Sequence, residues 1–144
     1  MTALPSGYEI VEDPDRIDVT ATHAYLTRSY WAQGIPLDTV QRSIEGSHCV
    51  AVRYADQQVA FARVVTDHAT FAYLADVYVL EEHRGRALSH AMLAHLQGHH
   101  RLQGLRRWAL FTRDAQELYR QHGWAEYPYP DRMMVIDKPD IYTS

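Results

Sequence analysis

Hydrophobic residues recur along the chain with two different periods, and the change of period separates helices from strands. Spacings of three or four residues predict one helix that begins near Asp18 and a second that follows Pro36. Runs rich in Val, Phe and Tyr predict strands over 48–54, 58–65 and 70–80, joined by short polar turns. The middle of the chain is therefore expected to form antiparallel hairpins.

The second half of the chain alternates between the two periods. A charged stretch after Leu80 leads into one helix. Asp114 and Glu117 have the spacing of a capping box at the start of a second helix, and Gly123 is placed to end that second helix. Further strands are predicted at 8–11, 106–112 and 133–136. This order predicts an α+β (mixed α/β) fold, with a mixed sheet between helices, in a single domain over 1–144.

Composition limits the class of protein. The chain has 144 residues, of which 47% are apolar, enough to bury a core. Cys49 is the single cysteine, which excludes an internal disulfide and, without a charged and apolar leader, favours a cytoplasmic protein. The net charge of −4 and the short apolar runs argue against nucleic acid and membranes as partners.

A basic turn separates the strand over 70–80 from the helix that follows it. A helix start presents unpaired amides and the positive end of the helix dipole, which suits a phosphate group. The small residues Gly85, Ala87 and Ser89 would let a ligand approach the backbone, and Arg84 and Arg86 add charge and donors. The alternative is an ordinary solvated helix start that has two arginines.

Two segments resemble the Gcn5-related N-acetyltransferase (GNAT) family. The stretch 79–89 resembles its acetyl-CoA signature, in which Arg or Gln is followed by two residues, Gly, one residue, and Gly or Ala. Arg84 matches this signature, while Ala87 and Ser89 replace its later small residues. The stretch 110–124 resembles the family's later strand and helix, with Trp in place of the usual Phe. Two motifs in the expected order are more specific than either alone.

The resemblance implies a fold and a reaction. The fold would be a mostly antiparallel sheet of about six to seven strands, flanked by about four helices, with a splayed parallel pair over 74–80 and 106–112. The pantetheine arm of acetyl-CoA would lie between these two strands. The reaction would be direct acetyl transfer to a primary amine, so Cys49 is not needed as a nucleophile and is expected to be a buried thiol.

The same resemblance implies which residues bind the cosubstrate. Tyr119 matches a tyrosine that donates a proton to the departing sulfur, although a core tyrosine is the alternative. An amide of the splayed strand, that of Val79, would hold the thioester carbonyl. The implied cosubstrate-binding residues are Val77, Tyr78, Val79, Arg84, Gly85, Arg86, Ala87, Leu88, Ser89, Asp114 and Tyr119.

Asp76 is a carboxylate within an apolar strand, and it is costly to bury unless it is paired. It is expected either to act as the catalytic base or amine anchor, or to pair with a backbone group or Arg63. Strand alternation predicts that Leu74, Asp76 and Tyr78 share one face.

The acceptor side is the least determined by the sequence. Tyr30, Trp31, Arg63, Asp67 and Tyr78 are expected to line it, with ordinary surface or core positions as the alternative for each. A cationic small-molecule amine is the expected substrate. A homodimer is compatible with the sequence.

Nine histidines raise the question of a metal. His95 and His99 are four residues apart on a predicted helix, a spacing that can support zinc. No cysteine cluster or acidic third ligand accompanies them in the sequence, so no metal is expected, and a helical zinc module stays an alternative. A non-catalytic acyl-CoA-binding or sensing module is the main alternative to an enzyme.

Overall fold

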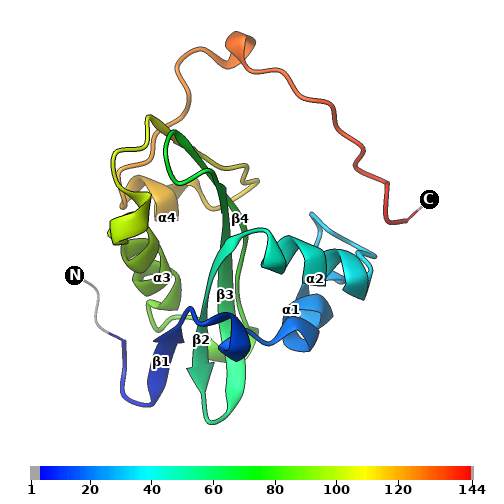
Figure 1. Cartoon of the computed structure of the whole chain (residues 1–144), viewed down its shortest axis with the longest axis vertical. Helices are drawn as coiled ribbons and strands as arrows, with labels where there is room; N and C mark the ends of the chain where they lie inside the picture. Colours follow the sequence, from blue (N-terminus) through cyan, green and yellow to red (C-terminus); the bar gives the residue numbers. More distant parts are fainter. Residues whose placement is uncertain (1–3, 144) are drawn as a thin grey trace.

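The computed structural model describes residues 4–143, and its centre is a five-stranded sheet in the order β1-β2-β3-β4-β5 (Figure 1). Neighbouring strands are antiparallel except for the parallel pair β4–β5. The strands are β1 (Tyr8–Val11), β2 (His48–Tyr54), β3 (Gln57–Thr66), β4 (Phe71–Val79) and β5 (Arg107–Ala109). The mostly antiparallel sheet with one parallel pair is thus confirmed.

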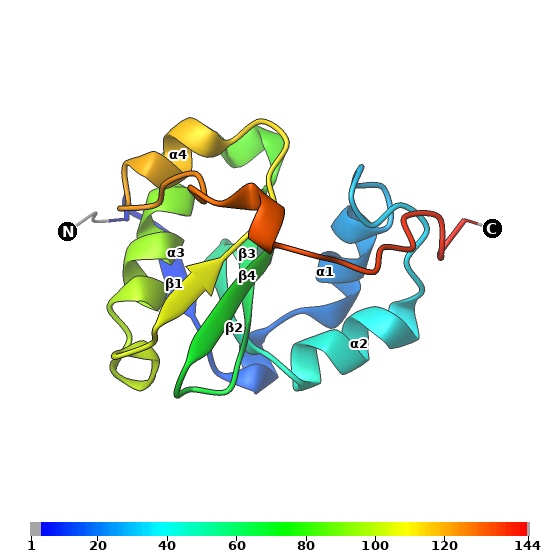
Figure 2. The same cartoon turned by 90° about the horizontal axis from the view of Figure 1, so that it is seen from above.

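Helices cover both faces of the sheet, with α1 and α2 on one side and α3 and α4 on the other (Figure 2). They are α1 (Val19–Leu26), α2 (Leu37–Glu45), α3 (Leu88–Gln97) and α4 (Gln116–Arg120). Short 3-10 turns occupy Pro14–Arg16, Glu81–His83, His100–Leu102 and Pro130–Arg132. Within residues 4–143, no helix has the length and apolar character needed to cross a membrane.

Two apolar cores lie on the two faces of the sheet. One packs Leu74 of β4 and Leu93 of α3 together, and the other packs Val40 of α2 against Phe61 of β3. Cys49 belongs to the second core, and burial raises the pKa of its thiol to about 12. The expected buried, protonated thiol is therefore confirmed.

Local signals placed the starts of the first two helices correctly. The side chain of Asp18 accepts a hydrogen bond from the Ala21 amide at 2.9 Å, which caps α1. Pro36 immediately precedes α2. The capping box predicted at Asp114 is wrong, because α4 begins one residue after Ala115, whose amide donates instead to Thr112 Oγ1 at 3.0 Å.

A β-bulge in β4 is the feature of the sheet that matters most for the site. Asp76 has a φ of +58°, and the pairing register shifts beside it, between Phe61 and Arg63 of β3. The extra residue rotates the rest of the strand. Leu74 therefore packs in the core beneath α3, whereas Tyr78 packs in the core beneath α1 and α2. The prediction that these residues share one face is wrong for this reason.

The parallel pair is short. Phe71–Tyr73 of β4 pairs with Arg107–Ala109 of β5, and no further pair joins the two strands in the described part of the chain. The strand predicted over 106–112 is therefore reduced to three residues. Beyond this pairing β4 continues to Val79 with β3 on one side only. The side that β5 borders at Phe71–Tyr73 is therefore open beside the last residues of β4.

The C-terminal segment departs most from the prediction. Residues 133–136 form no strand but an extended arm, drawn in orange and red in Figure 1, in which Met134 and Ile136 are 92% and 93% exposed. The arm ends near Gly34, where an added Cβ would lie 2.8 Å from the carbonyl oxygen of Tyr142. The sheet among residues 4–143 thus has five strands, not six to seven.

Candidate functional site

A cleft of about 590 Å³ opens where β4 continues past its pairing with β5. It is bordered by the end of β4, the turn into α3, the start of α4 and the end of α1 with its following loop. The lining residues are Tyr25, Tyr30, Trp31, Val77, Tyr78, Val79, His83, Arg84, Gly85, Ala87, Leu88, Ser89, His90, Arg113, Asp114, Ala115, Leu118 and Tyr119.

This lining contains every residue predicted to bind the cosubstrate except Arg86. The Arg86 guanidinium is turned away and donates to the carbonyl oxygen of Glu82 at 3.3 Å. The two matching segments thus bring their residues together on the walls of one cleft. That these residues bind a cosubstrate stays a prediction.

The turn into α3 leaves backbone donors free at the cleft. Ala87 is the N-cap residue of α3, in a left-handed conformation with φ 62° and ψ 25°, and no side chain caps the helix. The first intrahelical bond runs from the Ala91 amide to the Ala87 carbonyl at 3.1 Å. The amides of Leu88, Ser89 and His90 thus have no partner within the helix. Together with the helix dipole, they can hold an anion.

The last residues of β4 direct another donor into the cleft. The Leu80 amide donates to the Val59 carbonyl of β3 at 2.8 Å, which makes the opposing residues Ala60 and Val79 a non-hydrogen-bonded pair. The amide and carbonyl of Val79 consequently point away from β3, towards the gap beside β4. Arg84 confirms this direction, because its Nε donates to the Val79 carbonyl at 3.1 Å.

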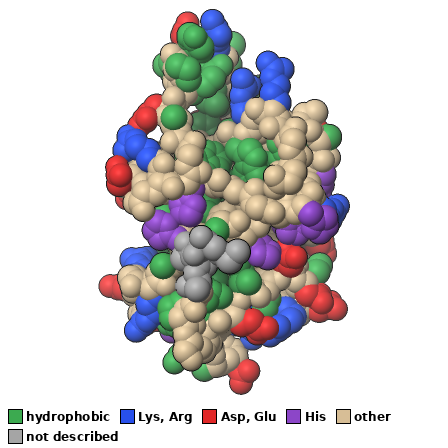
Figure 3. All heavy atoms as spheres, turned by 90° about the vertical axis from the view of Figure 1, so that its left-hand side faces the viewer, with side chains coloured by type: hydrophobic (Ala, Val, Ile, Leu, Met, Phe, Trp, Pro, Cys, Tyr) green, Lys and Arg blue, Asp and Glu red, His purple; other side chains and the backbone are tan. Residues whose placement is uncertain are grey.

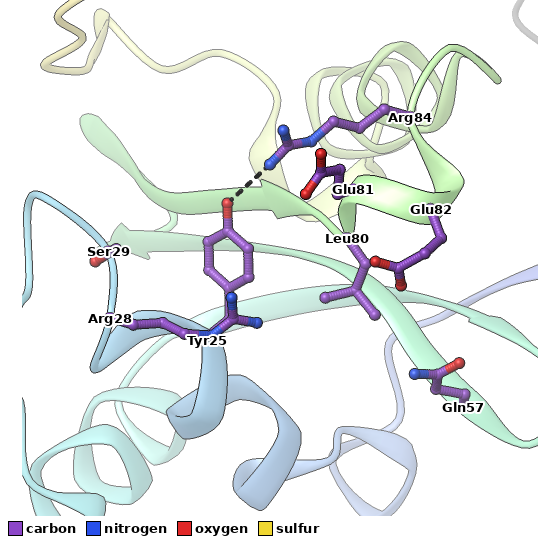
Figure 4. A pocket seen from close by; sticks show the side chains of 8 residues that line it. All are labelled: Tyr25, Arg28, Ser29, Gln57, Leu80, Glu81, Glu82 and Arg84. Carbon is purple, nitrogen blue, oxygen red and sulfur yellow. Dashed lines mark hydrogen bonds between the residues drawn. The ribbon is translucent and has the colours of Figure 1, made fainter.

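Arg84 also links the cleft to a smaller pocket of about 350 Å³, shown in Figure 4. Its Nη2 donates to the Tyr25 hydroxyl at 3.2 Å, and both residues line both cavities. Glu81 and Glu82 supply two carboxylates to the smaller pocket, and Arg28 and Arg84 supply two guanidinium groups. Charges of both signs therefore line this pocket, beside the free amides of the cleft.

Tyr119 lies in α4 and is only 8% exposed. Burial, and next the neighbouring Tyr30, raise the pKa of Tyr119 to about 12, so its phenol is neutral at pH 7. No described residue hydrogen-bonds its hydroxyl, although every fully enclosed side-chain polar atom among these residues has a partner. The hydroxyl is therefore accessible from the cleft and can donate a proton there.

Asp76 does not line the cleft, because both of its oxygens are engaged behind it. Oδ1 accepts from Trp31 Nε1 and Oδ2 accepts from Arg63 Nε, each at 2.9 Å. Arg63 also donates to the Ser47 hydroxyl at 3.1 Å and lies outside the cleft. Of the two alternatives for Asp76, the structure displays the pairing with Arg63, and this pairing holds Trp31 at the cleft wall.

The acceptor-side predictions divide into two groups. Tyr30 and Trp31 line the cleft, and the Arg113 guanidinium lies 3.8 Å from the centre of the Tyr30 ring. Tyr78 also borders the cleft but is 3% exposed, and its hydroxyl accepts from Gln58 Nε2 at 3.1 Å, so its ring serves mainly the core.

Asp67 is a correction to the predicted acceptor side. It lies in the turn between β3 and β4 and does not line the cleft. Its carboxylate accepts from the amides of Ala69, Thr70 and Phe71, and hydrogen bonds, those from Thr70 first, lower its pKa. It shapes the hairpin turn.

The sequence analysis missed several residues that line the cleft. Arg113 falls within the matching stretch 110–124 and was detectable there, whereas Tyr25 of α1 has no sequence signal that ties it to β4. Tyr25 stacks on Tyr78 with ring centres 4.1 Å apart. Nδ1 of His90 lies 2.8 Å from Nε2 of His122. Both contacts join residues far apart in the sequence, so they depend on tertiary packing.

A model of the acetyltransferase (GNAT) domain matches residues 45–126. The chain belongs to the GNAT acetyltransferase family. The matched residues include both segments on which the resemblance rests. The mixed fold with its parallel pair is thus that of a GNAT domain.

Individual relatives extend this similarity to nearly the whole chain. A Gibberella zeae protein described as a predicted acetyltransferase is 32% identical over 153 residues, covering 90% of this chain and 85% of the relative. A crystal structure from Xanthomonas campestris pv. campestris, described as a predicted GNAT acetyltransferase, is 41% identical with a TM-score of 0.94, covering 99% and 100% of the two chains.

A structure from Clostridium acetobutylicum, described as a predicted acetyltransferase with acetyl-CoA, has a TM-score of 0.64 at 15% identity. It covers 90% of this chain and 94% of that chain. This likeness concerns the fold alone.

Proposed function

We propose that this protein transfers the acetyl group of acetyl-CoA directly to the primary amine of a small molecule. The observation that supports this most is that one cleft is bordered by the free amides of α3, the Val79 amide and the neutral Tyr119 hydroxyl. Each of these groups meets one requirement of acyl transfer: binding of the donor, polarisation of the thioester and protonation of the leaving sulfur.

The residues present suit the diphosphate of the cosubstrate. A Cβ at Gly85 would meet no atom within 4 Å, so the space above this turn is open to a ligand. The amides of Leu88, Ser89 and His90 would hold the diphosphate, and Arg84 would pair with its charge. When bound, acetyl-CoA supplies the thioester and its thiolate leaving group.

The chemistry then depends on two groups of this chain. The Val79 amide, directed into the gap, would hydrogen-bond the thioester carbonyl as negative charge develops on it. The ammonium group of the substrate would lose one proton to solvent before its nitrogen attacks the thioester carbon. Tyr119 would donate its proton to the departing sulfur, and the second proton lost by the nitrogen would restore the Tyr119 phenol. Its raised pKa keeps that proton available at any physiological pH.

The smaller pocket is the proposed place of the amine. A free alkylamine has a pKa near ~10 and arrives protonated, so carboxylates favour its binding. Glu81 and Glu82 supply these carboxylates, opposed by the guanidinium groups of Arg28 and Arg84 in the same lining, and Tyr25 and Arg84 join this pocket to the cleft. Asp76 acts as a positioning residue, because its bond to Trp31 Nε1 holds that indole at the wall of the larger cleft.

Release of free thiol from acetyl-CoA in the presence of a panel of small amines tests the proposal. We expect turnover with cationic amines and a large loss in Tyr119→Phe. Binding of coenzyme A without turnover on any amine would favour the non-catalytic acyl-CoA-binding module. Absence of both binding and turnover would refute the proposal. Cytoplasmic location and a homodimer stay predictions, which fractionation and sedimentation can test.

A further inference from the structure

Four side chains converge at the end of α3 that lies away from the cleft. Glu12 follows β1, His48 begins β2, His95 lies in the last turn of α3 and His99 follows that helix. Oε2 of Glu12 lies 3.0 Å from His95 Nε2, 3.2 Å from His99 Nε2 and 3.3 Å from His48 Nε2. Histidine side chains form several patches on this face of the molecule (Figure 3).

Hydrogen bonding alone accounts poorly for this arrangement. A carboxylate oxygen has two lone pairs, yet three imidazole nitrogens surround this one. Zinc binds His nitrogen and carboxylate oxygen at roughly 2.0–2.2 Å, so the ligand atoms of a tetrahedral site are roughly 3.3–3.5 Å apart. The three distances from Glu12 Oε2 to the imidazole nitrogens, 3.0–3.3 Å, lie at or just below that spacing.

Burial also suits a metal site. The His48 and His99 side chains are 10% and 9% exposed, whereas those of His95 and Glu12 are 31% and 40% exposed. His48 and His99 are thus fixed within the protein, whereas Glu12 and His95 are accessible from solvent. The ligand atoms of Glu12, His48 and His99 all lie within 4.8 Å of one another.

We infer that Glu12, His48 and His99, with His95 beside Glu12, form a binding site for a divalent transition-metal ion, and that zinc is the ion they suit best. Two imidazoles and one carboxylate are a ligand set that zinc accepts, and His95 or a water would complete four-coordination. The ion would tie the end of β1, the start of β2 and the end of α3 together. His95 lies about 10 Å along α3 from Leu88, which lines the cleft, and His99 lies beyond the end of the helix, so the role is structural.

This inference departs from the expectation that no metal binds. The sequence analysis found no acidic ligand near His95 and His99. Glu12 supplies it from 83 residues earlier in the chain than His95, and only the fold brings the two together.

One contact must change when the metal binds. Nδ1 of His99 accepts a hydrogen bond from the Arg101 amide at 3.1 Å, which leaves the imidazole proton on Nε2. Coordination through Nε2 moves that proton to Nδ1 and removes the bond. The Arg101 amide resonance is therefore expected to shift on zinc binding, a signature that nonspecific surface binding would not produce.

Calorimetric titration of zinc chloride into the tag-free, chelator-treated full chain tests this site. We expect one zinc ion per chain with a Kd below about 1 μM. Free zinc at about one hundred times the Kd should raise the Tm by roughly 5–10 °C. Glu12→Gln and His48→Gln should each weaken zinc binding at least about tenfold.

His100→Gln is the matched control. His100 is exposed and stacks on His99 with ring centres 4.6 Å apart, but it makes no hydrogen bond to Glu12 among the described contacts. This variant should keep the parental zinc affinity. An absence of stoichiometric binding, or equal losses in His100→Gln and Glu12→Gln, would overturn the inference. The affinity for coenzyme A, measured with and without zinc, should not change, so this result is independent of the proposed catalysis.

Discussion

Replacement of Ala87 by glycine should stabilise the protein, although it introduces a more flexible residue at the start of a helix. Ala87 has φ 62° and ψ 25°, where the Cβ of an L-residue crowds the backbone. That conformation costs about 1–2 kcal/mol for alanine and almost nothing for glycine. The greater conformational entropy of glycine stabilises the unfolded chain by about 0.4–1 kcal/mol. The expected net gain in the free energy of unfolding is therefore about 0.5–1 kcal/mol.

Thermal unfolding measures this gain. For a chain of 144 residues, about 1 kcal/mol corresponds to a Tm change of roughly 2–5 °C, so Ala87→Gly should melt up to that much higher. Ala94→Gly, the same replacement in the interior of α3, is the matched control and should lose about 1 kcal/mol. The amide donors of the turn are unaltered, so the affinity for coenzyme A should not fall.

A fall in Tm in both glycine variants would refute the reasoning. It would mean that Ala87 adopts an ordinary helical conformation, and that the amides assigned to the anion site are oriented differently. An unchanged Tm in Ala94→Gly would show that the assay does not resolve backbone effects of this size.

Other variants test the separate parts of the site. Tyr119→Phe should lower turnover, measured by steady-state kinetics, about 10²-fold or more. Its affinity for coenzyme A, measured by calorimetry, should change little, and unaltered turnover would contradict the role of Tyr119. Burial raises the pKa of the Tyr119 phenol in the folded protein. The stabilisation that the neutral phenol gives the folded state is therefore complete below about pH 10 and is lost as the pH rises through about 12. Denaturant unfolding should therefore show a smaller alkaline loss in the Phe variant than in the parent. Arg84→Ala should raise the Kd for coenzyme A about 10-fold or more, and equal affinity would show that this arginine does not contact phosphate. Asp76→Asn should cost about 1–3 kcal/mol of stability by breaking the pair with Arg63, whereas lost turnover at unchanged stability would make Asp76 the base instead.

Local patterns were sufficient to predict most helices and strands. The periodicity that begins at Asp18 and the β-branched runs over 48–54 and 58–65 match α1, β2 and β3 closely, because each depends on neighbouring residues. The arm over 133–136 shows the limit of such patterns. A β-prone sequence forms a strand only beside a partner, and in residues 4–143 no strand lies next to it.

Residues of the candidate site were predicted correctly to lie together where they belong to one motif. The predictions were wrong where tertiary packing determines a residue's position. Residues 84–89 line the cleft except Arg86, because one turn places them together. The bulge at Asp76 adds one residue to β4 without any compositional signal, and it moves Tyr78 to the opposite core. Arg63 was one of the partners predicted for Asp76, whereas the second partner, Trp31, depends on tertiary packing and carries no sequence signal.

A crystal structure of the protein soaked with acetyl-CoA tests the central claim most directly. We expect density for the diphosphate against the amides of Leu88, Ser89 and His90, and the thioester beside Val79, with its sulfur within hydrogen-bonding reach of the Tyr119 hydroxyl. Cosubstrate bound elsewhere on the molecule, or a cleft that stays empty at saturating acetyl-CoA, would contradict the account.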